Sequence, residues 1–164
     1  MTKEIISEIF QEKFENIPEI IIKSPGRINL LGEHTDYNDG FVLPATIDKT
    51  MNFAASQNKD KMLRIHAIDL NEYIELPIHQ LTKHNYQWAN YLIGVFSLMP
   101  EKSKLLGIDC VFSGNIPIGG GLSSSAAMTT GFATLISRLF NLNISKTDIA
   151  KLSQKAEHDF AGVK

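Results

Sequence analysis

Apolar residues return every three or four positions in several stretches of the chain, as they do on the buried face of a helix. This spacing predicts a helix over residues 3–14 and a second over 88–99, which stops before Pro100. It also predicts a core helix over about 123–140 and a further helix that starts after Ser145, whose side chain can cap it. Each of these helices has one apolar face, so each needs another layer of structure to pack against.

Short apolar runs between turn-forming residues predict strands rather than helices. They cover residues 19–23, 28–31, 47–56, 62–68, 73–76 and 107–112. The strands largely precede the helices and several form hairpin-like pairs, an order typical of α+β proteins rather than of alternating strand–helix units. We therefore expect an α+β fold in which a sheet packs against helices.

Composition and charge exclude several function classes. The 164 residues are 43% hydrophobic and 21% charged, with a net charge of −2, so the basic excess typical of nucleic-acid binding is missing. No apolar run approaches the roughly 20 residues that a membrane helix needs, and acidic residues interrupt the first apolar stretch, unlike in a signal peptide. We expect a cytoplasmic protein without a nucleic-acid or membrane partner. The single cysteine, Cys110, cannot form an internal disulfide and is expected to be buried.

Three glycines and three serines, at 119–121 and 123–125, stand between an apolar strand and an apolar helix. Glycines let the backbone approach an anion closely, and the start of a helix adds free N–H groups and the positive end of its dipole. Serine hydroxyls can donate to phosphate oxygens or ligate Mg²⁺. No lysine lies between Leu106 and Lys146, so this is not a Walker A loop. The pattern predicts a phosphate-binding loop; the alternative is a flexible linker before an ordinary helix.

A second polar segment holds Arg27, Glu33, His34, Asp36 and Tyr37 among several glycines. A carboxylate can accept two neighbouring sugar hydroxyls at once, a task that suits Glu33 and Asp36. Arg27 could stabilise charge on a transferred phosphoryl group or lower the pKa of a nearby carboxylate. Two alternatives stay open on these residues alone. One is a metal site built on Glu33, His34 and Asp36, and the other is a turn whose charges face water.

Both segments together resemble the galactokinases of the GHMP small-molecule kinase superfamily. The run GRINLLGEHTDYNDGFVLP, residues 26–44, is similar to the galactokinase signature, and PIGGGLSSSAA, residues 117–127, is similar to the superfamily's ATP-binding motif. The run KAEHDFAGV, residues 155–163, resembles the helix end that precedes the family's catalytic aspartate. The resemblance spans the chain from about Ile21 to Lys164, in order.

The resemblance implies a role for each matched residue. Arg27 would stabilise the transition state, and Glu33, His34, Thr35 and Asp36 would contact galactose. Ser125 and Glu157 would ligate Mg²⁺, which takes few protein ligands because it keeps waters and phosphate oxygens. The ATP phosphates would lie against the loop residues Gly119, Gly120, Gly121, Leu122, Ser123, Ser124 and Ser125.

The implied fold is the α+β N-terminal domain of the GHMP kinases, of the ribosomal protein S5 domain 2 type, with a mixed sheet packed against helices. The whole of residues 1–164 would be this domain. The family's catalytic aspartate, its later tyrosine contact to the sugar and its C-terminal domain would lie beyond Lys164, so we expect a truncated chain. The full-length family is usually monomeric, whereas truncation would expose apolar surface and favour self-association.

The implied reaction is phosphoryl transfer from MgATP to the anomeric hydroxyl of α-D-galactose, giving galactose 1-phosphate in the Leloir pathway. One alternative is a regulator or binding fragment that senses galactose and ATP without catalysis; the intact run Ser123–Ala127 favours an enzyme ancestor. Another is a kinase for a related sugar, such as N-acetylgalactosamine or arabinose. The run Arg27–Asp36 argues against a kinase for mevalonate or homoserine.

Overall fold

A five-stranded mixed sheet is the centre of the fold. The computed structural model describes residues 1–32, 35, 38, 40–101, 105–117 and 120–162. The strand order is β1-β2-β5-β3-β4, and every neighbouring pair is antiparallel except β3 and β5, which run parallel. The strands are β1 (Ile20–Leu31), β2 (Leu43–Asn58), β3 (Met62–Ala67), β4 (Glu72–Pro77) and β5 (Gly107–Gly114).

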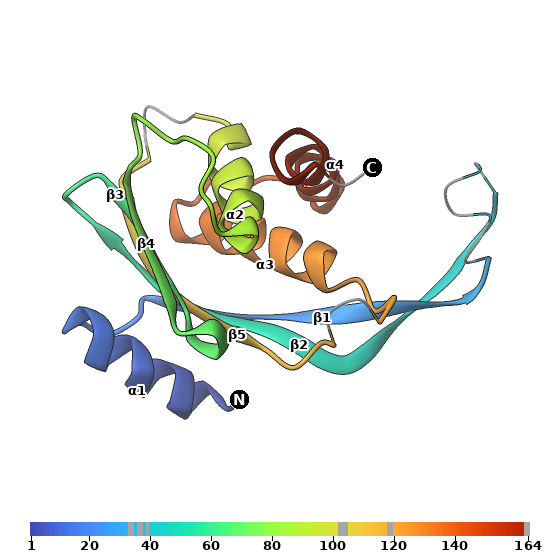
Figure 1. Cartoon of the computed structure of the whole chain (residues 1–164), viewed down its shortest axis with the longest axis horizontal. Helices are drawn as coiled ribbons and strands as arrows, with labels where there is room; N and C mark the ends of the chain where they lie inside the picture. Colours follow the sequence, from blue (N-terminus) through green and yellow to red (C-terminus); the bar gives the residue numbers. More distant parts are fainter. Residues whose placement is uncertain (33–34, 36–37, 39, 102–104, 118–119, 163–164) are drawn as a thin grey trace.

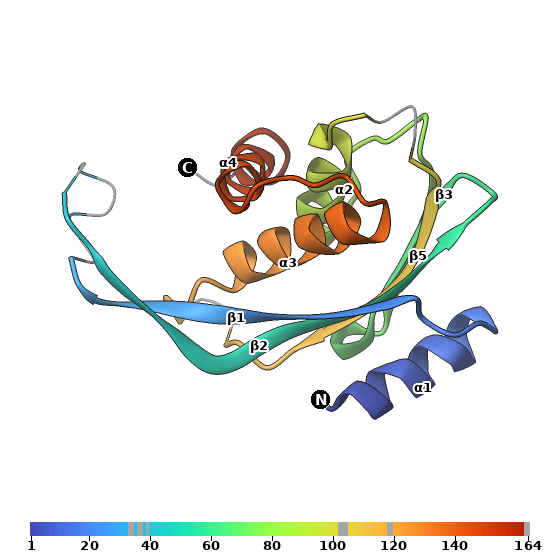
Figure 2. The ribbon, with the colours of Figure 1, turned by 180° about the vertical axis from the view of Figure 1, so that it is seen from behind.

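Helices cover both faces of this sheet, but unequally (Figures 1 and 2). Three of them, α2 (Gln87–Leu98), α3 (Ser124–Leu139) and α4 (Lys146–Ala156), lie on one face, and α1 (Lys3–Phe14) lies alone on the other. A 3₁₀ turn, η2 (Ile68–Leu70), joins β3 to β4, and a π-helical turn, η4 (Glu157–Ala161), extends α4. Among the described residues, no helix is both long and apolar enough to span a bilayer.

Side chains that alternate along the strands divide the core into two parts. On β5, Cys110 and Phe112 join the large cluster under α2, α3 and α4, whereas Val111 between them packs against α1. Phe53 of β2 links the sheet to α3, because its ring lies 5.8 Å from that of Phe112 and 6.3 Å from that of Phe132. Cys110 is fully buried as expected, and burial raises the pKa of its thiol, helped by the nearby charge of Asp109.

The α+β class and the mixed sheet are confirmed, and the predicted first helix has the observed bounds, Lys3–Phe14. Ser145 caps α4 as expected, because its hydroxyl accepts the Asp148 N–H at 3.1 Å. The predicted strand at 19–23 is too short, since β1 runs on through Pro25 to Leu31. Proline interrupts the ladder less here because β1 is an edge strand, although the pairing register does shift after Pro25.

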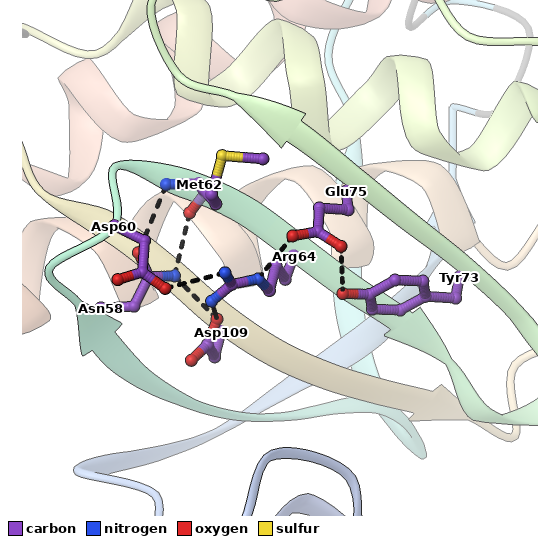
Figure 3. Close-up of polar contacts among 7 residues, drawn as sticks. All are labelled: Asn58, Asp60, Met62, Arg64, Tyr73, Glu75 and Asp109. Atoms are coloured by element: carbon purple, nitrogen blue, oxygen red, sulfur yellow. Dashed lines mark hydrogen bonds and ion pairs between the residues drawn. The ribbon is translucent and has the colours of Figure 1, made fainter.

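Arg64 is the centre of a polar network on the sheet face that carries α1 (Figure 3). Its guanidinium donates to Asp60 at 2.8 Å, to Glu75 at 2.9 Å and to the nearly buried Asp109 at 3.3 Å. The hydrogen bonds that Arg64 donates to Asp60 and then to Glu75 are the largest causes that raise the pKa of Arg64. Burial and then the charge of Glu75 raise the pKa of Tyr73 to about 12. The network ties β3, β4 and β5 together, because one guanidinium donates to carboxylates of Asp60, Glu75 and Asp109.

Candidate functional site

The two sequence motifs meet where β1 passes the glycine-serine loop. The Arg27 N–H donates to the carbonyl oxygen of Leu122 at 3.2 Å, which joins the strand to the loop by a backbone hydrogen bond. Gly26 permits this approach, because a Cβ at that position would lie only 2.9 Å from the same oxygen. Arg27 itself has an exposed side chain on this strand. The structure therefore brings Gly26 and Arg27 of the first motif against Leu122 of the second.

The loop turns sharply before it enters α3. Gly121 and Ser123 both have left-handed backbone, with φ of +68° and +57°, and such a conformation costs a non-glycine residue on the order of 1 kcal/mol. The side chain of Ser123 makes no capping hydrogen bond, although serine at this position usually caps a helix. The first N–H groups of α3 are thus not capped by that side chain, an arrangement that suits an anionic ligand.

Gly120 is the other described glycine of the run, and a Cβ there would meet nothing closer than 3.5 Å. Ser124 and Ser125 form the first turn of α3. Gly119 lies outside the described residues.

Ser125 and Glu157 lie in direct contact. The Ser125 hydroxyl donates to Oε2 of Glu157 at 3.0 Å, and the hydroxyl of Thr129, one helical turn further along α3, lies 2.9 Å from Oε1. Glu157 stands where α4 passes into η4, so two elements that are 32 positions apart in sequence build this contact. Within the described part of the chain, no group of three or more His, Cys, Asp and Glu side chains forms a metal cluster.

A cavity of about 360 Å³ opens beside the start of α3. Its walls are mostly apolar and aromatic, with Ser124 and Ser125 at one side. Trp88 and Tyr91 of α2 line it, although their helical spacing in the sequence predicted core positions. Apolar spacing is the same for side chains in a core and for side chains that line a cavity. The sequence pattern therefore could not show that Trp88 and Tyr91 line a cavity. The remaining lining residues are Met51, Ala67, Asp69, Leu70, Gln87, Phe112, Gly114, Ile116 and Met128.

Asp69 and Tyr91 are polar residues that line this cavity. Asp69 accepts hydrogen bonds from the Ser113 hydroxyl and from the Gly114 N–H, both at 2.7 Å. These two bonds fix the orientation of its carboxylate. Burial raises the pKa of Tyr91, and the negative charge of Glu157 adds to the effect. The cavity therefore lies next to the Ser125–Glu157 contact rather than apart from it.

Of the predicted galactose-contacting run, Thr35 is described and Glu33, His34 and Asp36 lie outside the described residues. The Thr35 hydroxyl lies 3.0 Å from the carbonyl oxygens of both Gly32 and Phe41, so it closes the turn between β1 and β2.

Exposed apolar side chains border that turn at Leu30, Leu31, Phe41, Val42 and Leu43. Figures 1 and 2 show this end of the β1–β2 ribbon extending beyond the helices.

Comparison with known proteins agrees with the two motifs. The galactokinase galactose-binding signature matches residues 8–57, and the GHMP kinases N-terminal domain matches residues 90–164. Galactokinase of Haemophilus influenzae (strain Rd) is 40% identical over 158 residues, which is 94% of this chain and 41% of that protein. Galactokinase of a Roseiflexus species (strain RS-1) is 41% identical over 159 residues, 96% of this chain and 41% of that protein.

A solved structure gives the same result in three dimensions. The crystal structure of Lactococcus lactis galactokinase complexed with galactose superimposes with a TM-score of 0.88 at 33% sequence identity, covering 98% of this chain and 43% of that one. The chain thus spans about two fifths of the length of the relatives it matches. With its galactokinase signature, its GHMP domain and this fold, the chain belongs to the galactokinase family and corresponds to the N-terminal part of its members.

Proposed function

We propose that this chain is the galactose- and ATP-binding part of a galactokinase. The full-length enzyme transfers the γ-phosphoryl group of ATP to the anomeric hydroxyl of α-D-galactose and releases ADP and galactose 1-phosphate. The observation that carries the proposal is the contact of Ser125 with Glu157, 3.0 Å long, at the start of α3 beside a loop that is bonded to the sugar-signature strand. We also propose that the full-length protein is a monomer and that it acts in the cytoplasm, where ATP is available.

The phosphates of ATP fit the start of α3. N–H groups that the Ser123 side chain does not cap, left-handed turns at Gly121 and Ser123, and the positive end of the helix dipole all favour an anion there. No lysine lies in this loop, so a cation must neutralise much of the phosphate charge. That cation is Mg²⁺ in this proposal, and when bound it would also polarise the γ-phosphoryl group.

The residues present fit Mg²⁺. Two adjacent ligands of an octahedral ion with bonds of about 2.1 Å stand about 3.0 Å apart, and the two oxygens of the Ser125–Glu157 contact are 3.0 Å apart. Mg²⁺ commonly takes only one or two protein ligands, with waters and phosphate oxygens supplying the rest. Ser125 and Glu157 would therefore hold the ion, as the resemblance to galactokinases implies.

The apolar cavity beside Ser124 fits the adenine base. Its volume of about 360 Å³ and its Trp88 and Tyr91 walls suit a flat aromatic ring, and it adjoins the phosphate end of the site. We propose that the base enters here while the triphosphate reaches the start of α3. Arg27 of β1, whose backbone is bonded to Leu122 of the loop, would then stabilise the charge that develops on the transferred phosphoryl group.

For the sugar side of the site, the resemblance to galactokinases points to Glu33, His34, Thr35 and Asp36, which lie between β1 and β2 in the sequence. The proton of the anomeric hydroxyl passes, in the family, to an aspartate that has no counterpart within residues 1–164. In the family that aspartate follows a few residues after the run matched here by residues 155–163, and the C-terminal region would complete the sugar site. Catalysis would rest mostly on positioning and charge stabilisation.

The test joins residues 1–164 to the part of the Haemophilus influenzae galactokinase that follows the matched segment. ADP release is followed with MgATP and galactose, N-acetylgalactosamine or arabinose. The proposal predicts release that depends on galactose, lost in Ser125→Ala and kept in Thr134→Val, whose hydroxyl donates to the Thr130 carbonyl oxygen of its own helix. Binding of both ligands without ADP release would favour the sensing regulator, and preference for another sugar would reassign the substrate.

A further inference from the structure

Glu157 stands at an irregular point of the backbone. The π-helical turn η4 begins at this residue and closes at Gly162, whose N–H donates back to the Glu157 carbonyl oxygen and whose φ is +72°. An extra residue in a helical turn changes the direction of the side chains that follow, and such turns are frequent at functional sites. The path of the backbone that follows Glu157 therefore depends on contacts that hold η4 in place.

One of those contacts is an aromatic ring against a glycine. Phe160 of η4 packs on α2 at Gly94, where an added Cβ would lie only 2.9 Å from the Phe160 Cβ and Cγ. Phe160 also lies against the main hydrophobic core. Gly94 thus admits the ring at close range, and the ring anchors the turn that carries Glu157.

A second contact holds the carboxylate itself. Thr129 is fully buried, and its hydroxyl lies 2.9 Å from Oε1 of Glu157, while Ser125 donates to Oε2. The Thr129 hydroxyl also lies 3.0 Å from the Ser125 carbonyl oxygen and 3.3 Å from the Ala126 carbonyl oxygen, so its single proton has three possible acceptors. An ionised carboxylate can only accept, so donation to Glu157 leaves the hydroxyl and the carboxylate both satisfied.

We propose that Thr129 and Phe160 are positioning residues that set Glu157 for metal binding. Thr129 fixes the rotation of the carboxylate so that Oε2 faces Ser125, and Phe160 fixes the backbone turn from which Glu157 projects. The inference rests on the proposed function, in which Ser125 and Glu157 hold the cation of the nucleotide. Neither positioning residue needs to touch the cation.

The experiment measures binding of Mn²⁺·ATP to the 164-residue chain by electron paramagnetic resonance, with ATP binding in EDTA measured beside it. Thr129→Val removes the hydroxyl at nearly constant volume and is expected to weaken metal binding about 10- to 100-fold, as loss of a residue that orients a ligand usually does. Thr129→Ser, which keeps the hydroxyl, is expected to restore it. Thr134→Val, a matched change on the same helix, is expected to bind like the parent chain.

A second variant guards against a folding defect in Thr129→Val. Phe160→Leu removes the ring at Gly94 and is expected to weaken Mn²⁺ binding while ATP binding in EDTA stays within about twofold, because the loop and α3 are untouched. Parent-like Mn²⁺ affinity in Thr129→Val, or in Phe160→Leu where the first variant does not fold, would overturn the inference. If the parent chain itself shows no metal-dependent ATP binding, the proposed function fails instead.

Discussion

Gly26 allows the sugar-signature strand to lie against the glycine-serine loop, and replacing it with alanine tests that arrangement. Its backbone is strand-like with no left-handed φ, so alanine is acceptable there for conformational reasons. The new Cβ would nevertheless stand 2.9 Å from the Leu122 carbonyl oxygen and 3.2 Å from Ile47 Cδ1. The side chain of Ile47 can adjust, but a backbone oxygen can move only if the loop moves with it.

The cost follows from two unfavourable effects and one favourable effect. Overpacking costs about 1–3 kcal/mol, and loss of the 3.2 Å hydrogen bond between Arg27 and Leu122 costs about 1 kcal/mol. Alanine restores about 0.4–1 kcal/mol by restricting the unfolded chain. We expect the free energy of unfolding to fall by about 2 kcal/mol, which lowers the melting temperature by about 6 °C for a chain of this size.

Thermal unfolding followed by circular dichroism measures the stability, and calorimetric titration with MgATP measures the function. Gly120→Ala is the matched control, since its Cβ would have only ordinary contacts, the nearest at 3.5 Å. Gly26→Ala should lower both the melting temperature and the ATP affinity. Gly120→Ala should leave the melting temperature unchanged and still weaken ATP binding, because its Cβ would stand between the backbone and the phosphates.

The outcome that refutes this reasoning is a Gly26→Ala chain with the melting temperature and the ATP affinity of the parent. Such a result would mean that the strand and the loop do not depend on each other. A loss of stability with unchanged ATP affinity would separate the packing of Gly26 from the function of the loop.

Two further predictions concern charged groups. Arg64→Met should lower the free energy of unfolding by about 2 kcal/mol in urea titrations, because the nearly buried Asp109 loses a charged partner. Asp60→Asn should lower it by less than about 1 kcal/mol, because the Asp60 side chain is 62% exposed. Equal losses in both variants would contradict the importance of burial. Glu157→Gln should lower the pKa of Tyr91, because removing a nearby negative charge makes the phenolate easier to form. Alkaline titration followed by tyrosinate absorbance measures this pKa. An unchanged pKa of Tyr91 would contradict the proximity of Tyr91 and Glu157.

Local signals predicted the helices well and the edge of the sheet poorly. The first helix has its predicted bounds because its apolar spacing is local to residues 3–14; the structure adds a cap at Thr2 that the prediction did not use. The first strand was predicted too short because Pro25 and Gly26 read as a break. Pairing with β2, a strand more than twenty positions away along most of its length, keeps the chain extended through both residues. An isolated sequence pattern cannot show that pairing.

The candidate site divides in the same way. The glycine-serine loop follows from chemistry, because glycines, hydroxyls and a helix start are adjacent in sequence. The contact of Ser125 with Glu157 spans 32 positions, and before the structure only resemblance to galactokinases joined them. The buried hydroxyl of Thr129 and the π-helical turn that begins at Glu157 had no sequence signal, since both depend on how α3, α4 and α2 pack.

The central claim is that Ser125 and Glu157 hold the cation of a bound nucleotide. Calorimetric titration of ATP into the 164-residue chain, with Mg²⁺ and then in EDTA, tests it most directly when the parent is compared with Glu157→Gln. The account predicts one saturable site in the parent that weakens at least tenfold in EDTA, and a variant whose weaker binding no longer responds to Mg²⁺. Equal affinity of parent and variant at saturating Mg²⁺, with the same response to EDTA, would contradict it.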